Sequence, residues 1–131
     1  MKSSRFIISI LFLMIFIFSS CKKAGIGGNV ELAVNVKHHN TLIPNAVVYI
    51  KYGAREFPGT ESKNYDNSAI CGDQDHLTGH THFSNLKKGY YYLYSVGWDS
   101  TINMTVAGGV PVQIKDKAGE MIIEIPVSEQ H

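Results

Sequence analysis

The residues best suited to chemistry lie in one short window, CGDQDHLTGHTH (71–82). The window holds one thiol, two carboxylates and three imidazoles, which are side chains that bind zinc or serve as nucleophile and base. If its histidine-rich end forms a strand, His80 and His82 point to the same face because they are two residues apart. Together with Cys71 and His76 from the approach to that strand, they form a candidate zinc site.

A solvated surface is the alternative interpretation of this window, and we favour it because the spacing matches no established metal motif. Catalysis has less support. Cys71 and His76 can pair as nucleophile and base, but no Asn or Asp is placed to orient the base. Asp73 and Asp75 lack the glycine and glutamate that a calcium loop requires at fixed spacing. We therefore expect no enzyme, no catalytic residues and no cofactor, with zinc kept as an alternative.

The N-terminus has the order of a bacterial export signal. Lys2 and Arg5 precede an apolar run at 6–18, which is shorter than the about 20 residues that span a membrane. The run leads into FSSC, which resembles the lipobox of bacterial lipoproteins. The resemblance implies that residues 1–20 are a signal peptide and that Cys21 carries acyl chains at the outer membrane of the cell envelope. An uncleaved N-terminal anchor is the alternative.

The charge balance and the cysteine content exclude some classes of function and of covalent structure. Without residues 1–20 the chain keeps 111 residues, enough for a single domain, with ten basic and eleven acidic side chains. This balance lacks the basic face that nucleic-acid binding requires. Once Cys21 is acylated, no intrachain disulfide can form. Lys22 and Lys23 stand where some surface-displayed lipoproteins carry acidic residues, so it stays open whether the domain faces the periplasm or the cell surface.

The remainder of the chain is patterned for β-structure. The glycine-rich residues 22–29 predict a flexible tether after the acylated residue 21, and residues 30–127 predict one domain, followed by a tail at 128–131. Within the domain, apolar and polar residues alternate with a period of two, which is typical of strands. Seven short strands are expected, at 30–36, 45–53, 79–86, 90–98, 101–108, 110–115 and 120–127. Many short strands separated by turns predict a β-sandwich.

One part of this pattern carries a family resemblance. The stretch TGHTHFSNLKKGYYYLYSVGWD (78–99) resembles the motif G-x-x-x-F-x-x-L-x-x-G-x-Y-x-L of transthyretin-like, or carboxypeptidase-regulatory-like, domains. The matching positions are Gly79, Phe83, Leu86, Gly89, Tyr91 and Leu93. The resemblance implies a seven-stranded Greek-key sandwich of immunoglobulin-like architecture, used as a packing or adhesive module without a shared catalytic set. The connection at 55–77 is longer than in that family, and such long connections are usually functional or disordered.

A row of tyrosines gives the domain a second candidate site. If Tyr91 points inward, Tyr90, Tyr92 and Tyr94 point outward together. A hairpin across the 86–89 turn sets His82 opposite Tyr92 and His80 opposite Tyr94. This aromatic face is either a contact surface or cross-strand packing. At the end of the same strand, Trp98 is expected to plug the interior.

Three functions fit these features. The first is a non-enzymatic accessory module that docks on an envelope assembly, such as a TonB-dependent nutrient transporter of the outer membrane. The second is a carbohydrate-binding lipoprotein that uses the tyrosines as stacking platforms, and the third is a zinc-binding protein built on residues 71–82. Separately, Asp99-Ser100-Thr101 resembles an O-glycosylation sequon of some bacterial envelopes, which makes Ser100 a candidate glycosylation site.

Overall fold

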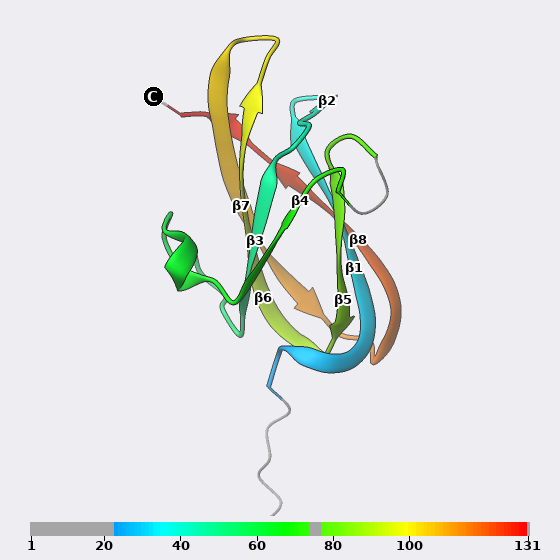
Figure 1. Cartoon of the computed structure of the whole chain (residues 1–131). Coiled ribbons are helices and arrows are strands. Elements are labelled where there is room, and N and C mark those ends of the chain that lie inside the picture. The colour runs from blue at the N-terminus through cyan, green and yellow to red at the C-terminus, as the bar shows by residue number, and fades with distance from the viewer. Residues whose placement is uncertain (1–22, 74–76, 131) are drawn as a thin grey trace, which may run out of the picture.

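Two β-sheets pack face to face to form an all-β sandwich (Figure 1), as the sequence predicts. The computed structural model describes residues 23–73 and 77–130. Cys21, with its expected acylation, and His76 lie outside these residues. In the described residues no helix is long and apolar enough to cross a membrane.

The first sheet is built around its longest strand. β1 (Ile26–His38) pairs antiparallel with β2 (Thr41–Leu42) and with β5 (His80–Leu86), and parallel with β8 (Ala118–Pro126). The second sheet has the order β4-β3-β6-β7-β9 and is antiparallel throughout. Its members are β3 (Val47–Tyr52), β4 (Asn67–Ile70), β6 (Gly89–Asp99), β7 (Met104–Ile114) and β9 (Ser128–Glu129). A 3-10 turn, η2 (Ser62–Asn64), lies between β3 and β4.

The strand count and the element bounds differ from the prediction. The described residues form nine strands rather than seven, because the short β2, β4 and β9 add to the sheets. The two strands expected at 101–108 and 110–115 are one strand, β7, whose Gly108 and Gly109 continue the ladder opposite Ser95 and Tyr94. β1 begins at Ile26, so the second half of the segment 22–29, which was expected to be a flexible tether, is part of a strand.

The predicted hairpin across residues 86–89 is wrong. β5 belongs to the first sheet and β6 to the second, so this tight connection passes from one sheet to the other. His82 therefore lies opposite Ala33 of β1, and Tyr92 lies opposite Lys51 and Pro111. The aromatic face that was expected to combine histidines and tyrosines does not exist, because the two sets sit on different sheets.

The predicted inward residues are confirmed. The sandwich core includes the inward-facing sides of β1, β5 and β6, together with Cys71, which is 1% exposed. The side chains predicted to point inward on these three strands are all buried: Val30, Leu32, Val34, Val36, Thr81, Phe83, Leu86, Tyr91, Leu93 and Ser95. Period-two alternation therefore identified the correct faces. Trp98 is an exception to the expected plug: it is 53% exposed, because it stands on the outward side of β6.

The hydroxyl of the fully buried Tyr91 fixes the point where the chain enters the sandwich. The Gly25 N–H donates to this hydroxyl at 2.9 Å, and the hydroxyl donates to the Lys87 carbonyl at 2.7 Å. In addition, the Lys87 N–H donates to the Gly25 carbonyl at 2.8 Å. Burial raises the pKa of Tyr91, so the hydroxyl remains a donor. The start of β1 is thus held against the β5–β6 connection.

Candidate functional site

The outer face of the second sheet is covered by residues 53–66, which we call the cover segment. Arg55 places its guanidinium 3.7 Å from the centre of the Tyr90 ring. Phe57 lies with its ring centroid 5.9 Å from that of Tyr92 and 5.2 Å from that of Tyr94. Tyr94 is consequently only 7% exposed. The expectation that all three tyrosines stand open to solvent is wrong for Tyr94, and the long connection supplies the cover.

Tyr65 completes this aromatic cluster, which consists of Tyr49, Phe57, Tyr65, Tyr92 and Tyr94. Its ring stacks 6.0 Å from Tyr94 and lies 5.5 Å from Tyr49. Its hydroxyl donates to the Gly59 carbonyl at 2.7 Å. Burial, followed by the neighbouring Tyr94 and Tyr92, raises the pKa of Tyr65 to about 12. The cluster holds the cover segment onto the sheet by contacts that require neutral tyrosines.

We expect alkaline pH to loosen this cluster. The pKa of Tyr65 is about 12 in the folded protein against roughly 10 in an unfolded chain. The unfolded state therefore loses its proton first, and the free energy of unfolding should fall as pH rises from about 10 toward about 12. Urea unfolding of wild type and Tyr65→Phe across this range checks the effect. The variant should show a shallower fall, and parallel curves would contradict it.

A shallow groove of about 290 Å³ runs beside the cluster. Phe57, Tyr92 and Tyr94 flank it, and Gly108 and Gly109 are among its lining residues. A Cβ at Gly109 would stand 2.7 Å from Cε1 of Tyr92, so the glycine allows the ring to lie close to the strand. Phe57 is half exposed and is the most accessible aromatic ring of this groove.

The two histidines of the predicted zinc site lie together on the outer face of the first sheet. Nε2 of His80 is 2.9 Å from Nε2 of His82, and Nδ1 of His82 is 2.8 Å from Oε1 of Glu31. His80 Nδ1 also hydrogen-bonds the Asn35 side chain. Cys71 does not share this surface, because its side chain is part of the core. Since His76 lies outside the described residues, zinc binding by this set stays a prediction.

The candidate glycosylation site lies on the turn after β6, where Ser100 is exposed. The residues on either side of it have structural roles. Asp99 is buried, and its Oδ1 accepts hydrogen bonds from the N–H of Thr101 at 2.9 Å and from its hydroxyl at 2.6 Å. Its Oδ2 contacts Nδ1 of His38 at 2.7 Å. These bonds, led by those from Thr101 and His38, lower the pKa of Asp99. Glycosylation of Ser100 stays a prediction.

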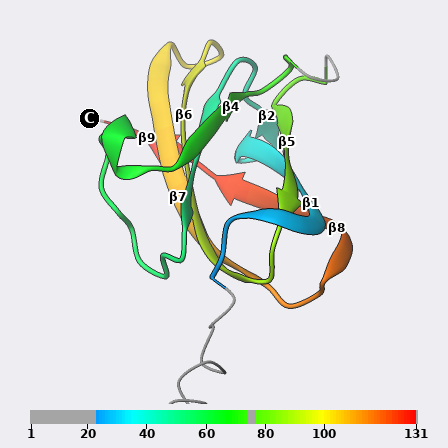
Figure 2. The ribbon, with the colours of Figure 1, turned by 60° about the horizontal axis from the view of Figure 1, so that its bottom comes forward.

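Basic side chains gather at the end of the sandwich where β1 begins. Three segments meet there: the start of β1, the β5–β6 connection and the β7–β8 connection (Figure 2). They surround a hollow of about 860 Å³. Its lining includes Lys87, Lys88, Lys115 and Lys117, and we call this region the lysine end.

The lysine end differs in its ion pairing from three lysines elsewhere on the described sandwich. Lys37, Lys51 and Lys63 form ion pairs with Glu124, Asp66 and Glu61, respectively. Within residues 23–73 and 77–130, the four lysines of the lysine end form no such pair, although Asp116 is nearby in sequence. Their positive charge is therefore directed to solvent. The lysines are evident in the sequence, but their proximity is not, because they belong to turns that only the fold brings together.

The lysine end, the aromatic groove and the histidine pair on β5 are thus candidates for binding a ligand or a surface. They lie on different parts of the sandwich, so substitutions can test each one separately. The chain matches no family model, and no similar protein was found among curated proteins or among solved structures.

Proposed function

We propose that the protein is a lipid-anchored, non-catalytic interaction module of the bacterial cell envelope. In this proposal the lysine end rests on anionic lipid headgroups of the membrane that holds Cys21. The single observation that supports it most strongly is the gathering of unpaired lysines at the end of the sandwich where β1 begins. The envelope location itself rests on the resemblance of FSSC to a lipobox.

The short connection to the anchor makes this orientation favourable. Gly25 is fixed to the sandwich by hydrogen bonds with Tyr91 and Lys87. Three residues separate it from Cys21, and the four Cα–Cα steps span at most about 14 Å when the chain is fully extended. Surface potentials at physiological salt decay over about 8 Å. An acyl chain on Cys21 would therefore let the lysine end come within the range of headgroup charge, where each lysine contributes about 1 kcal/mol.

The faces away from the lysine end are left for a partner. We propose a protein partner in an envelope complex, of which an outer-membrane nutrient transporter is one example. The outward parts of the aromatic cluster, above all the half-exposed Phe57, offer the kind of aromatic contact that is enriched at protein interfaces. Such a role needs a rigid binding surface and no catalytic residues.

Carbohydrate binding is a second candidate function. The observation in its favour is the groove of about 290 Å³ flanked by Phe57 and Tyr92, because an aromatic ring offers an apolar face beside polar groups. Glycan-array binding that Phe57→Ala abolishes, with vesicle binding unchanged, would favour this candidate. Binding to no glycan would remove it.

Vesicle binding by a soluble form that begins at Lys22 tests the proposed orientation without the contribution of the anchor. Replacing Lys87, Lys88 and Lys115 with Gln removes three positive charges from the lysine end. At about 1 kcal/mol per lysine, affinity for vesicles of phosphatidylcholine and phosphatidylglycerol should fall by roughly 100-fold. Sedimentation with the vesicles provides the measurement.

The matched control changes the same number of charges elsewhere. Lys37, Lys51 and Lys63 are replaced with Gln in a second triple variant, whose net charge equals that of the first. Because each of these lysines is ion-paired with a carboxylate, this variant should bind the anionic vesicles nearly as well as wild type. Equal losses in the two variants would show that net charge, and not the lysine end, controls the interaction.

A further inference from the structure

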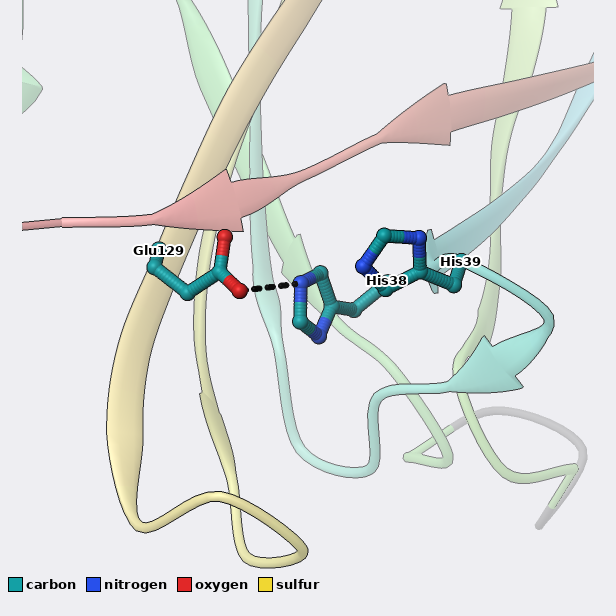
Figure 3. A group of neighbouring side chains, drawn as sticks. All are labelled: His38, His39 and Glu129. Carbon is teal, nitrogen blue, oxygen red and sulfur yellow. Dashed lines mark ion pairs between the residues drawn. The ribbon is translucent and has the colours of Figure 1, made fainter.

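A second group of polar side chains lies near the end of β1 that is remote from its start. His38 is the last residue of β1, His39 begins the turn to β2, and Glu129 belongs to β9 (Figure 3). One ligand atom from each of them falls within 4.8 Å of the other two. Strands from both sheets thus bring two imidazoles and one carboxylate together.

The buried member of this group is held in one orientation. His38 is 5% exposed, and its Nδ1 lies 2.7 Å from Oδ2 of Asp99, which is itself buried. Asp99 is fixed in turn by two hydrogen bonds from Thr101. Because a carboxylate only accepts hydrogen bonds, Nδ1 of His38 must carry a proton. In the neutral ring, Nε2 then presents its lone pair on the side of Glu129.

The space between Nε2 of His38 and Glu129 suits a cation. Nε2 has no hydrogen-bond partner, and Oε1 of Glu129 stands 3.4 Å away. This is longer than an ordinary N–H···O bond. It is close to the distance of about 3.3 Å between two ligand atoms that each lie 2.0–2.1 Å from a tetrahedral zinc ion. A lone pair facing a carboxylate at this distance is repulsive unless a positive charge joins them.

We propose that His38, His39 and Glu129 form a binding site for a divalent transition-metal ion, with zinc as the best fit. Two imidazoles and one carboxylate are a ligand set that zinc accepts, with the fourth position left for water or a partner's side chain. Asp99 acts as a positioning residue, because a carboxylate on the far nitrogen of a ligating histidine orients the ring and raises its basicity. His39 and Glu129 are accessible from solvent, so an ion can enter.

A proton is the competing occupant of this space. The hydrogen bond with Asp99, followed by the charge of Glu129, raises the pKa of His38. An imidazolium would satisfy the pair without any metal. A direct metal titration at neutral pH separates the two cases.

The test uses the full-length protein, purified in detergent without a histidine tag. Titration with Co²⁺ should give visible absorption bands of a tetrahedral site at one ion per chain, and Zn²⁺ should displace Co²⁺ and abolish them. His39→Ala and Glu129→Gln remove one ligand each from the accessible side, so the fold should be retained. Each should weaken the affinity by at least about 10-fold. Asp99→Asn should weaken it by about 10- to 100-fold and shift the bands of the Co²⁺ that still binds.

The matched control is the double variant His80→Ala and His82→Ala, which removes the other histidine pair and should leave the titration unchanged. The proposal is overturned by the absence of Co²⁺ bands in wild type, by wild-type affinity in both His39→Ala and Glu129→Gln, or by loss of binding only in the His80 and His82 variant. None of these outcomes bears on vesicle binding by the lysine end, so the metal site and the proposed function are tested independently of each other.

Discussion

Replacing Tyr91 with Ser should destabilise the protein by about 3–5 kcal/mol, the range found for deleting a buried aromatic ring. Tyr91 is fully buried between the sheets. The substitution leaves a cavity there and also removes the hydroxyl that joins Gly25 to Lys87. Because domains of this size are stable by only about 5–15 kcal/mol, we expect much of the variant to unfold at low urea. Urea denaturation followed by circular dichroism measures the loss.

The variant Tyr91→Phe distinguishes the contribution of the ring to stability from that of the hydroxyl. It retains the packing and should cost about 1–2 kcal/mol, because the Gly25 N–H and the Lys87 carbonyl each lose a hydrogen bond. Amide hydrogen exchange at Gly25 should accelerate in this variant more than exchange in β7. If Tyr91→Ser were as stable as wild type, both the inward orientation of this side chain and the fixed entry of the chain would be wrong.

Replacing Tyr94 with Ser should destabilise the protein by roughly 3 kcal/mol, at the low end of values for aromatic deletions because its neighbour Phe57 is half exposed. The ring lies under Phe57 and Tyr65 and stacks beside Tyr49. Its loss should release the cover segment from the second sheet. Amide hydrogen exchange should therefore rise at residues 53–66 while the two sheets stay protected.

Tyr90→Ser provides the control for this prediction. Tyr90 stands on the same face, but its only described aromatic or cationic contact is with Arg55 at 3.7 Å. A cation–π contact at an exposed site contributes about 0.5–1 kcal/mol, so the loss should be small. Equal stability losses at Tyr90 and Tyr94 would contradict the role of the cover segment.

These two tyrosines show what the sequence can predict. The inward orientation of Tyr91 follows from alternation, because adjacent side chains on a strand point to opposite faces. The burial of Tyr94 does not follow from it. Tyr94 faces away from the core and is buried by Phe57 and Tyr65, which belong to a connection without a regular pattern. Alternation predicts toward which face of the sheet a side chain points, but it does not predict which other segments cover that face.

The connection at 86–89 failed as a prediction for a related reason. Its Leu-Lys-Lys-Gly sequence has the turn residues of a hairpin, but a tight turn can equally lead to the opposite sheet. The choice depends on strand pairing with distant parts of the chain, here β5 with β1 and β6 with β3 and β7. The pairing of β1 with β8 is equally remote in sequence.

The proposed metal site was missed for the same physical cause. His38 and Asp99 are separated by 61 positions, and Glu129 lies in what was expected to be a C-terminal tail. The adjacent pair His38 and His39 was the one visible signal in the sequence. By contrast, the three histidines of residues 71–82 attract attention because they are close in sequence, yet the core position of Cys71 separates it from the surface that His80 and His82 share.

The most direct test of the central claim is lysine accessibility on a membrane. The acylated full-length protein is reconstituted in vesicles of phosphatidylcholine with or without phosphatidylglycerol, treated briefly with an amine-reactive reagent and analysed by mass spectrometry. Labelling of Lys87, Lys88, Lys115 and Lys117 should fall on the anionic vesicles and recover at about 1 M salt, where the screening length is about 3 Å. Labelling of Lys37, near the far end of β1, should not change. Equal labelling of the lysine end on both kinds of vesicle would contradict the proposal that it rests on anionic headgroups.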